Sequence, residues 1–149
     1  MKIAIATDHN GVEEKQKIIE SLIEYTFLDE STDNTPTDDY PDFAFRVAQR
    51  VMRHEADLGV LMCGTGIGMS IAANKVKGIR AAHCSNIEQA RLAKEHNNAN
   101  IICISYKQPI EEIKNMIKTF IETYPSTEER HIRRVNKIVD YERGNYNEL

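Results

Sequence analysis

One segment of the chain combines a cysteine with three glycines at alternate positions, Cys63-Gly64-Thr65-Gly66-Ile67-Gly68. Glycines spaced in this way permit backbone angles at which consecutive N–H groups can point at one anion. A helix that starts after the loop would add the positive end of its dipole and would stabilise the thiolate form of Cys63. The segment predicts a reactive thiol beside an anion hole, although a lone glycine loop fits a tight strand-to-helix turn equally well.

The anion hole favours a functional Cys63 over an inert one, whereas Cys84 and Cys103 are expected to be inert buried thiols. The spacing GxGxG differs from the dinucleotide fingerprint GxGxxG, and the segment lacks the GK[ST] ending of a P-loop. A phosphatase-type cysteine loop needs an arginine shortly after it, but Met69 and Ser70 stand there. The segment therefore predicts none of these three sites.

A second polar segment, Asp8-His9-Asn10-Gly11, follows the first apolar run of the chain. Asp8 could orient or charge a neighbouring group, and His9 could donate a hydrogen bond to a phosphate. The alternative is a turn closed by the Asp8 side chain, with His9 as a bystander. A receiver domain would need an aspartate at the end of the third strand, where Met62 and Cys63 stand.

Two further groups carry chemistry near the carboxyl half of the chain. His96 and Asn97 end a predicted helix, where a histidine is often only a cap or a partner of the helix dipole. Arg130 and Arg134 are four residues apart and share a helix face with His131. Such a face suits a phosphate, which accepts forked hydrogen bonds from arginine, although a solvated charged helix would look the same.

These residues must be positioned by alternating apolar strands and amphipathic helices. The expected strands are Lys2–Thr7, Tyr25–Asp29, Leu58–Met62, Ile79–His83 and Asn100–Ser105. The expected helices are Val12–Glu24, 41–53, Met69–Lys75, 86–96, Pro109–Tyr124 and 127–143, and 30–39 is expected to be a loop. Strands that alternate with helices predict an α/β fold, a Rossmann-like three-layer sandwich with a five-stranded parallel sheet and helices on both faces.

Ligands of such sheets bind at the carboxyl ends of the strands. This rule selects Thr7–Gly11, Cys63–Gly68, His83–Asn86 and Ser105–Lys107 as the segments that could line a site. The 149 residues fit one domain, and a net charge of −4 argues against a nucleic-acid or anionic-membrane partner. Single cysteines without metal-type spacing, and no apolar run of membrane-spanning length, predict a cytoplasmic protein without a metal.

The chain resembles the type-B ribose-5-phosphate isomerases, within the wider family that includes the galactose-6-phosphate isomerase subunits. The resemblance covers nearly the whole chain, and its specific parts are Asp8-His9, Asp39-Tyr40-Pro41, CGTGIGMSIAANK at 63–75, GIRAA at 78–82 and EHNNAN at 95–100. It implies a dimer of Rossmann-like domains with active sites between subunits, to which the helix at 127–143 contributes. Pairing of dimers into a tetramer is left open.

The resemblance also implies the roles of individual residues. Cys63 would be the base that removes the proton from the sugar carbon next to the carbonyl, and His96 the acid that opens the sugar ring. Asp8 and Thr65 would complete the catalytic set. The substrate-binding residues implied are Asp8, His9, Tyr40, Gly64, Thr65, Gly66, Ile67, Gly68, Asn97, Lys107, Arg130 and Arg134. Aldose–ketose isomerisation needs no redox cofactor, and the expected partner is a phosphorylated sugar.

The sequence departs from the family pattern at three places. Ser105-Tyr106-Lys107 stands where a small-residue pair and an arginine are usual, the loop 30–39 lacks a usual glycine, and His83 replaces an apolar residue. Ribose-5-phosphate is the expected substrate. An isomerase of a hexose 6-phosphate such as allose or galactose remains an alternative, and so does a sugar-phosphate-binding module without turnover.

Overall fold

The structure is a computed structural model that describes residues 1–148. Five parallel strands form one sheet in the order β2-β1-β3-β5-β4. The strands are β1 (Lys2–Thr7), β2 (Thr26–Asp29), β3 (Leu58–Cys63), β4 (Ala81–His83) and β5 (Ile101–Ser105). The helices are α1 (Val12–Ser21), α2 (Tyr40–Met52), α3 (Ile67–Ala73), α4 (Ile87–Asn97), α5 (Ile110–Glu122) and α6 (Glu129–Glu142). The predicted three-layer α/β fold is confirmed.

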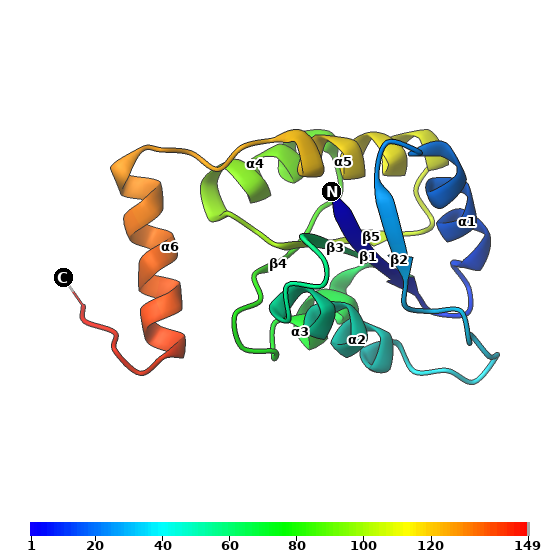
Figure 1. The fold of residues 1–149 in the computed structure, drawn as a ribbon, viewed down its shortest axis with the longest axis horizontal. Helices are drawn as coiled ribbons and strands as arrows, with labels where there is room; N and C mark the ends of the chain where they lie inside the picture. The colour runs from blue at the N-terminus through cyan, green and yellow to red at the C-terminus, as the bar shows by residue number, and fades with distance from the viewer. Residues whose placement is uncertain (149) are drawn as a thin grey trace.

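Helices cover both faces of the sheet (Figure 1). Because side chains alternate along a strand, Ile3 and Ile5 pack on the face covered by α1, α4 and α5, whereas Ala4 and Ala6 face α2 and α3. In β3, Met62 belongs to the first of these cores and Cys63 to the second. The side chain of Cys63 therefore lies on the face of the sheet that α2 and α3 cover.

The strand order places a topological switch between β1 and β3. The chain leaves β1 for its neighbour β2 on one side, then crosses back to β3 on the other. Ligands of doubly wound sheets bind outside the carboxyl ends of the strands at such a point. The ends of β1 and β3 are Thr7 and Cys63, the residues that introduce the two polar loops.

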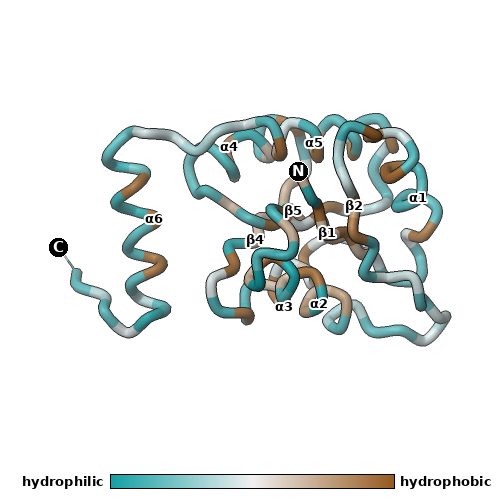
Figure 2. Tube along the Cα trace, in the orientation of Figure 1, coloured by the Kyte–Doolittle hydropathy of each residue, from teal (hydrophilic) through white to brown (hydrophobic). Residues whose placement is uncertain are grey.

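Helix α6 stands apart from the rest of the domain (Figure 1). It joins the body at α4 and at Gly78, whose N–H donates to the Glu142 carboxylate at 2.9 Å. Apolar residues recur along the helix in Figure 2, and the side chains of Ile132 and Ile138 are 46% and 52% exposed. These apolar side chains, the apolar stripe of α6, are therefore about half exposed in a single chain. No helix within residues 1–148 is long and apolar enough to cross a membrane.

Two predicted boundaries were wrong for local reasons. The first helix ends at Ser21 instead of Glu24 because the chain turns at Leu22, and Ile23, beyond the turn, is 82% exposed. The fourth strand begins at Ala81 instead of Ile79 because the Arg80 N–H donates to the side chain of Asn100 at 2.8 Å. The remaining elements agree with their predicted ranges to within a few residues.

Candidate active site

The end of β3 brings the thiol of Cys63 into contact with the glycine loop. The Gly66 N–H donates to the Cys63 Sγ at 3.1 Å. Gly66 has φ +83°, and a Cβ there would lie 3.1 Å from the backbone of Ile104, so the turn requires glycine. The loop leads directly into α3, and Thr65 Oγ1 accepts the N–H of Ile67 at 3.1 Å. The sulfur thus accepts one backbone N–H of the glycine loop, and only 6% of Cys63 is exposed.

Tyr40 borders this loop from the neighbouring helix. It is the first residue of α2, and its ring lies so close to Gly68 that a Cβ there would be 2.6 Å from the ring carbons. Tyr40 is 39% exposed, so one side of the ring remains open. The structure thus places Tyr40, which the family resemblance implies as a substrate-binding residue, beside the glycine loop.

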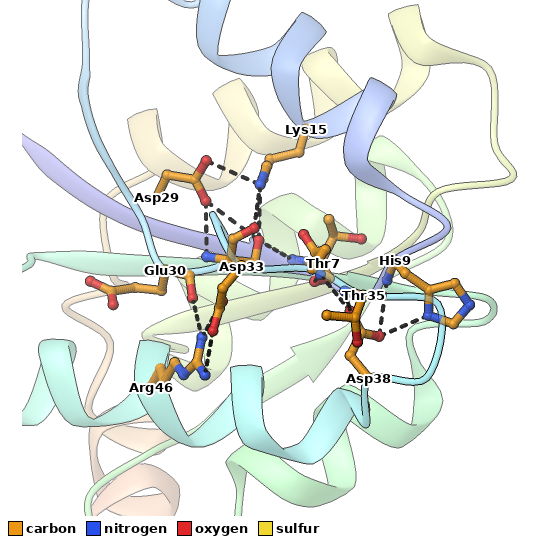
Figure 3. Close-up of polar contacts among 11 residues, drawn as sticks. Thr7, His9, Lys15, Asp29, Glu30, Asp33, Thr35, Asp38 and Arg46 are labelled. Atoms are coloured by element: carbon orange, nitrogen blue, oxygen red, sulfur yellow. Dashed lines mark hydrogen bonds and ion pairs between the residues drawn. The ribbon is translucent and has the colours of Figure 1, made fainter.

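The loop after β1 combines a side-chain turn with a long-range ion pair. Asp8 Oδ1 accepts the Asn10 N–H at 3.0 Å, which is the turn considered as the alternative for this segment. His9 also contacts a residue that is distant in the sequence. Its Nδ1 lies 2.8 Å from Oδ1 of Asp38, and its backbone N–H donates to the same oxygen at 3.1 Å (Figure 3).

The end of β5 ties the glycine loop to the third polar segment. Ser105 Oγ donates to the carbonyl of Gly64 at 2.8 Å and accepts the Lys107 N–H at 3.1 Å. The Tyr106 N–H donates to the carbonyl of Cys63 at 3.2 Å. These bonds place Lys107, which is exposed, at the rim of the same strand ends as Cys63.

A second cluster forms where α4 ends and α6 begins. The rings of His96 and His131 stack at a centroid distance of 4.0 Å with an interplanar angle of 9°. Burial lowers the pKa of His131, and the neighbouring His96 lowers it further, so the His131 ring is neutral near neutral pH. Arg130 and Arg134 lie exposed on α6, and Arg130 Nη2 contacts Glu128 at 3.0 Å.

Within one chain, the two clusters lie at opposite edges of the sheet. One edge is formed by the carboxyl ends of the strands and the other by their amino ends. Helix α4 leaves the carboxyl edge after β4 and returns to the amino edge, where Arg80 Nη2 donates to the carbonyl of Asn98 at 2.9 Å. In the ladder between β3 and β5, Cys63 pairs with Ser105, whereas Gly59 pairs with Ile101 at the other edge. At about 3.3 Å per residue, the length of β3 alone separates the edges by about 16 Å.

Comparison with known proteins agrees with this fold. Residues 3–138 match the family described as Ribose/Galactose Isomerase. A probable ribose-5-phosphate isomerase B from Mycoplasma pneumoniae is 42% identical over 95% of both chains. The galactose-6-phosphate isomerase subunit LacB from Clostridium acetobutylicum is 40% identical over 98% of this chain and 88% of its own. Ribose-5-phosphate isomerase B from Mycoplasma genitalium, solved with bound ribulose-5-phosphate, superposes with a TM-score of 0.90 at 40% identity, covering 95% of this chain and 96% of that one.

The chain belongs to the ribose/galactose isomerase family. It is a sugar-phosphate isomerase similar to ribose-5-phosphate isomerase B. Within this isomerase the strand ends bring together one part of the predicted site. That part comprises Asp8, His9, Tyr40, Cys63, Gly64, Thr65, Gly66, Ile67, Gly68 and Lys107. The remaining predicted residues, His96, Asn97, Arg130 and Arg134, lie in the second cluster.

Ser105–Lys107 was expected from the sequence to line a site, but only Lys107 was given a role, and the structure brings Tyr106 to the same strand ends. Its ring carbon Cδ2 lies 3.2 Å from where a Cβ on Gly11 would stand, and its hydroxyl lies 3.7 Å from the corresponding point on Gly64. Burial raises the pKa of Tyr106, and the charge of Asp8 raises it further. The hydroxyl therefore remains a neutral donor between the two polar loops. Its place one residue before Lys107, at a strand end, was the signal in the sequence.

Proposed function

We propose that this isomerase interconverts ribose-5-phosphate and ribulose-5-phosphate through an enediolate, with Cys63 as the base. The observation that carries the proposal is the Cys63 Sγ, which lies 3.1 Å from the Gly66 N–H at the end of β3. As a thiolate, this sulfur would take the proton from C2 of the aldose and return it to C1, while the proton of the C2 hydroxyl passes to O1. The pair of electrons from the C–H bond would pass into the enediolate and back, so no oxidant or reductant is consumed.

The glycine loop would stabilise the charge that develops on the substrate oxygen. Backbone donors held in place before the reaction are commonly worth several kcal/mol in the transition state. Gly64, Thr65, Gly66, Ile67 and Gly68 would supply this hole, because the loop is fixed by Ser105 and by the helix that follows it. Asp8 and Tyr40 would line the sugar on either side, and His9 and Lys107 would contact its polar groups.

The second cluster would complete the site from a partner subunit. His96 would protonate the ring oxygen to open the sugar, Asn97 would bind a sugar group, and Arg130 and Arg134 would bind the phosphate. The position of this cluster at the opposite edge of the sheet from Cys63 supports a site shared between two copies. The uncovered apolar stripe of α6, with Ile132 and Ile138, supports the same dimer.

A hexose 6-phosphate is the second candidate substrate. The likeness to LacB at 40% identity and the departure at Ser105-Tyr106-Lys107 favour it, because Lys107 keeps the charge of the usual arginine but lacks its planar fork. The bound ribulose-5-phosphate of the Mycoplasma genitalium protein supports the pentose. We therefore infer ribose-5-phosphate as the main substrate, with the hexose as a lesser one.

A direct test is conversion of ribose-5-phosphate to ribulose-5-phosphate by the purified protein, with and without a chelator. We expect chelator-insensitive turnover that falls by about 10²- to 10⁴-fold in Cys63→Ala, the usual range for loss of a general base. Cys84→Ala, which removes another buried thiol, is the matched control and should retain activity. Turnover that survives Cys63→Ala would remove Cys63 as the base, and turnover of hexose 6-phosphates alone would exchange the substrate.

A further inference from the structure

Asp38 lies beside His9 in the structure, although the two residues are 29 positions apart in the chain. Oδ1 of Asp38 accepts two hydrogen bonds from His9, from the backbone N–H at 3.1 Å and from the ring Nδ1 at 2.8 Å. The Asp38 side chain is 7% exposed and that of His9 is 34% exposed. The carboxylate thus lies on the inner side of the ring, and the rest of the ring remains accessible.

The second carboxylate oxygen of Asp38 is also held. Oδ2 accepts Nδ2 of Asn34 at 2.9 Å and the backbone N–H of Thr35 at 3.1 Å. Burial favours the neutral acid, but these bonds and those from His9 outweigh it and lower the pKa of Asp38. Asp38 is therefore an anion whose orientation is fixed by four donors.

The loop that carries Asp38 is itself anchored to the sheet and to α2 (Figure 3). Asn34 Nδ2 also donates to the carbonyl of Thr7 at 3.0 Å, the last residue of β1. Arg46 of α2 binds both oxygens of Asp33, at 2.7 and 3.1 Å, and the carbonyl of Glu30. Because the loop is anchored at both points, the position of Asp38 relative to the end of β1 is determined before any ligand arrives.

We propose that Asp38 is a positioning residue, which holds the His9 ring with its proton on Nδ1 and presents Nε2 to the substrate. Figure 3 shows one ring nitrogen turned toward Asp38 and the other away from it. A carboxylate on Nδ1 selects the tautomer and the orientation of a histidine ring. Nε2 then accepts from a sugar hydroxyl when the ring is neutral, and donates to an anionic oxygen when the ring is protonated.

This inference rests on the proposed function, in which His9 contacts the sugar phosphate. If Asp38 only stabilised the loop, its removal would change neither the tautomer of the His9 ring nor the binding of the substrate. Asp33 provides the comparison, because it lies in the same loop and binds Arg46 without contact to His9. Its removal should disturb the loop to a similar degree and leave the ring alone.

The test compares Asp38→Ala, His9→Ala, the double variant and Asp33→Ala. In the full-length protein, side-chain ¹⁵N shifts should show the His9 proton on Nδ1, and Asp38→Ala should give a mixture of tautomers while Asp33→Ala does not. KM for ribose-5-phosphate should rise about 10-fold in Asp38→Ala with a smaller change in kcat. The double variant should be no worse than His9→Ala alone, because the two residues act as one unit.

The outcomes separate this inference from the proposed function. If Asp38→Ala leaves the tautomer unchanged, or if the effects of Asp38→Ala and His9→Ala on KM add, the positioning role is wrong. If His9→Ala itself leaves KM unchanged, the role of His9 in binding fails, and with it the effect expected of Asp38 on the substrate. If the protein does not turn over ribose-5-phosphate, the proposed function is wrong. The tautomer of His9 in the wild type and in Asp38→Ala would then still show whether Asp38 positions the ring.

Discussion

At the scale of single residues, the site depends on a few contacts that no local pattern contains. Gly66 is required by its positive φ, whereas Gly64 has only the hydroxyl of Tyr106 within 4 Å of its added Cβ. The glycine spacing alone does not distinguish Gly64 from Gly66. The structure separates them, because Gly66 shapes the turn around the Cys63 sulfur and Gly64 leaves room for the side chain of Tyr106, which follows β5.

Tyr106 supplies a prediction about sugar size. Its ring fills space between Gly11 and Gly64, so Tyr106→Ala should admit a longer sugar. We expect the ratio of kcat/KM for hexose 6-phosphates to that for ribose-5-phosphate to rise about 10-fold, since one carbon in a pocket is commonly worth 1–3 kcal/mol. Parallel assays on both sugars would measure it. Tyr124→Ala, at a tyrosine that is 86% exposed between α5 and α6, should leave the ratio unchanged, and an unchanged ratio in Tyr106→Ala would exclude Tyr106 from the site.

At the scale of elements, asparagine side chains make hydrogen bonds to the short strand β4 and its approach that the backbone of a further strand would otherwise make. The Asn74 amide donates to the carbonyl of Ala81 at 2.9 Å and accepts the Ala81 N–H at 2.8 Å, as a neighbouring strand would. Asn100 holds Arg80 and Gly78 in a similar way. The segments 63–75, 78–82 and 95–100, which carry the family resemblance, therefore contain residues that hold β4 and the end of α4 in place as well as residues proposed for chemistry.

The loop between β2 and α2 gives a prediction of pH dependence. The folded pKa of Asp38 is lowered from its ordinary value of about 3.9, so its contribution to stability is present above about pH 4 and is lost as the pH falls through the lowered pKa. Asp38→Asn should reduce the unfolding free energy near neutral pH by about 1.5–3 kcal/mol, as for a hydrogen bond to a charged group.

Denaturant unfolding of the wild type and Asp38→Asn at a series of pH values would measure this effect. The difference between the two proteins should shrink as the pH falls below about 4, where Asp38 becomes protonated. If the difference persisted unchanged to pH 2, the lost stability of Asp38→Asn would come from the altered hydrogen-bonding shape of the side chain and not from the loss of its charge.

At the scale of the whole molecule, the separation of the two clusters predicts complementation between inactive chains. Cys63→Ala and His96→Ala should each be inactive alone. If the two residues of each site come from different copies, as proposed, a mixed dimer would have one site with both changes and one site with neither. Refolding the two variants together should restore about a quarter of wild-type activity, since half of the dimers are mixed and half of their sites are intact.

Size-exclusion chromatography with light scattering would verify that the mixture is dimeric. Co-refolding Cys63→Ala with Tyr40→Ala is the matched control, because both residues lie at the same strand ends and no intact site can form. Absence of recovered activity with His96→Ala, in a mixture that does exchange subunits, would show that each site is built within one chain.

The sequence by itself determined the order and kind of the elements, the parallel sheet and the carboxyl-end loops. These follow from local periodicity and from glycine, whose effects act within a few residues. Only the tertiary structure decided that β5 lies between β3 and β4, that Asp38 contacts His9, and that Tyr106 lies between Gly11 and Gly64. It also placed His96 and the arginines of α6 at the edge opposite Cys63. Strand order and long-range contacts depend on which faces pack together, and apolar periodicity marks a buried face without identifying the face that it contacts.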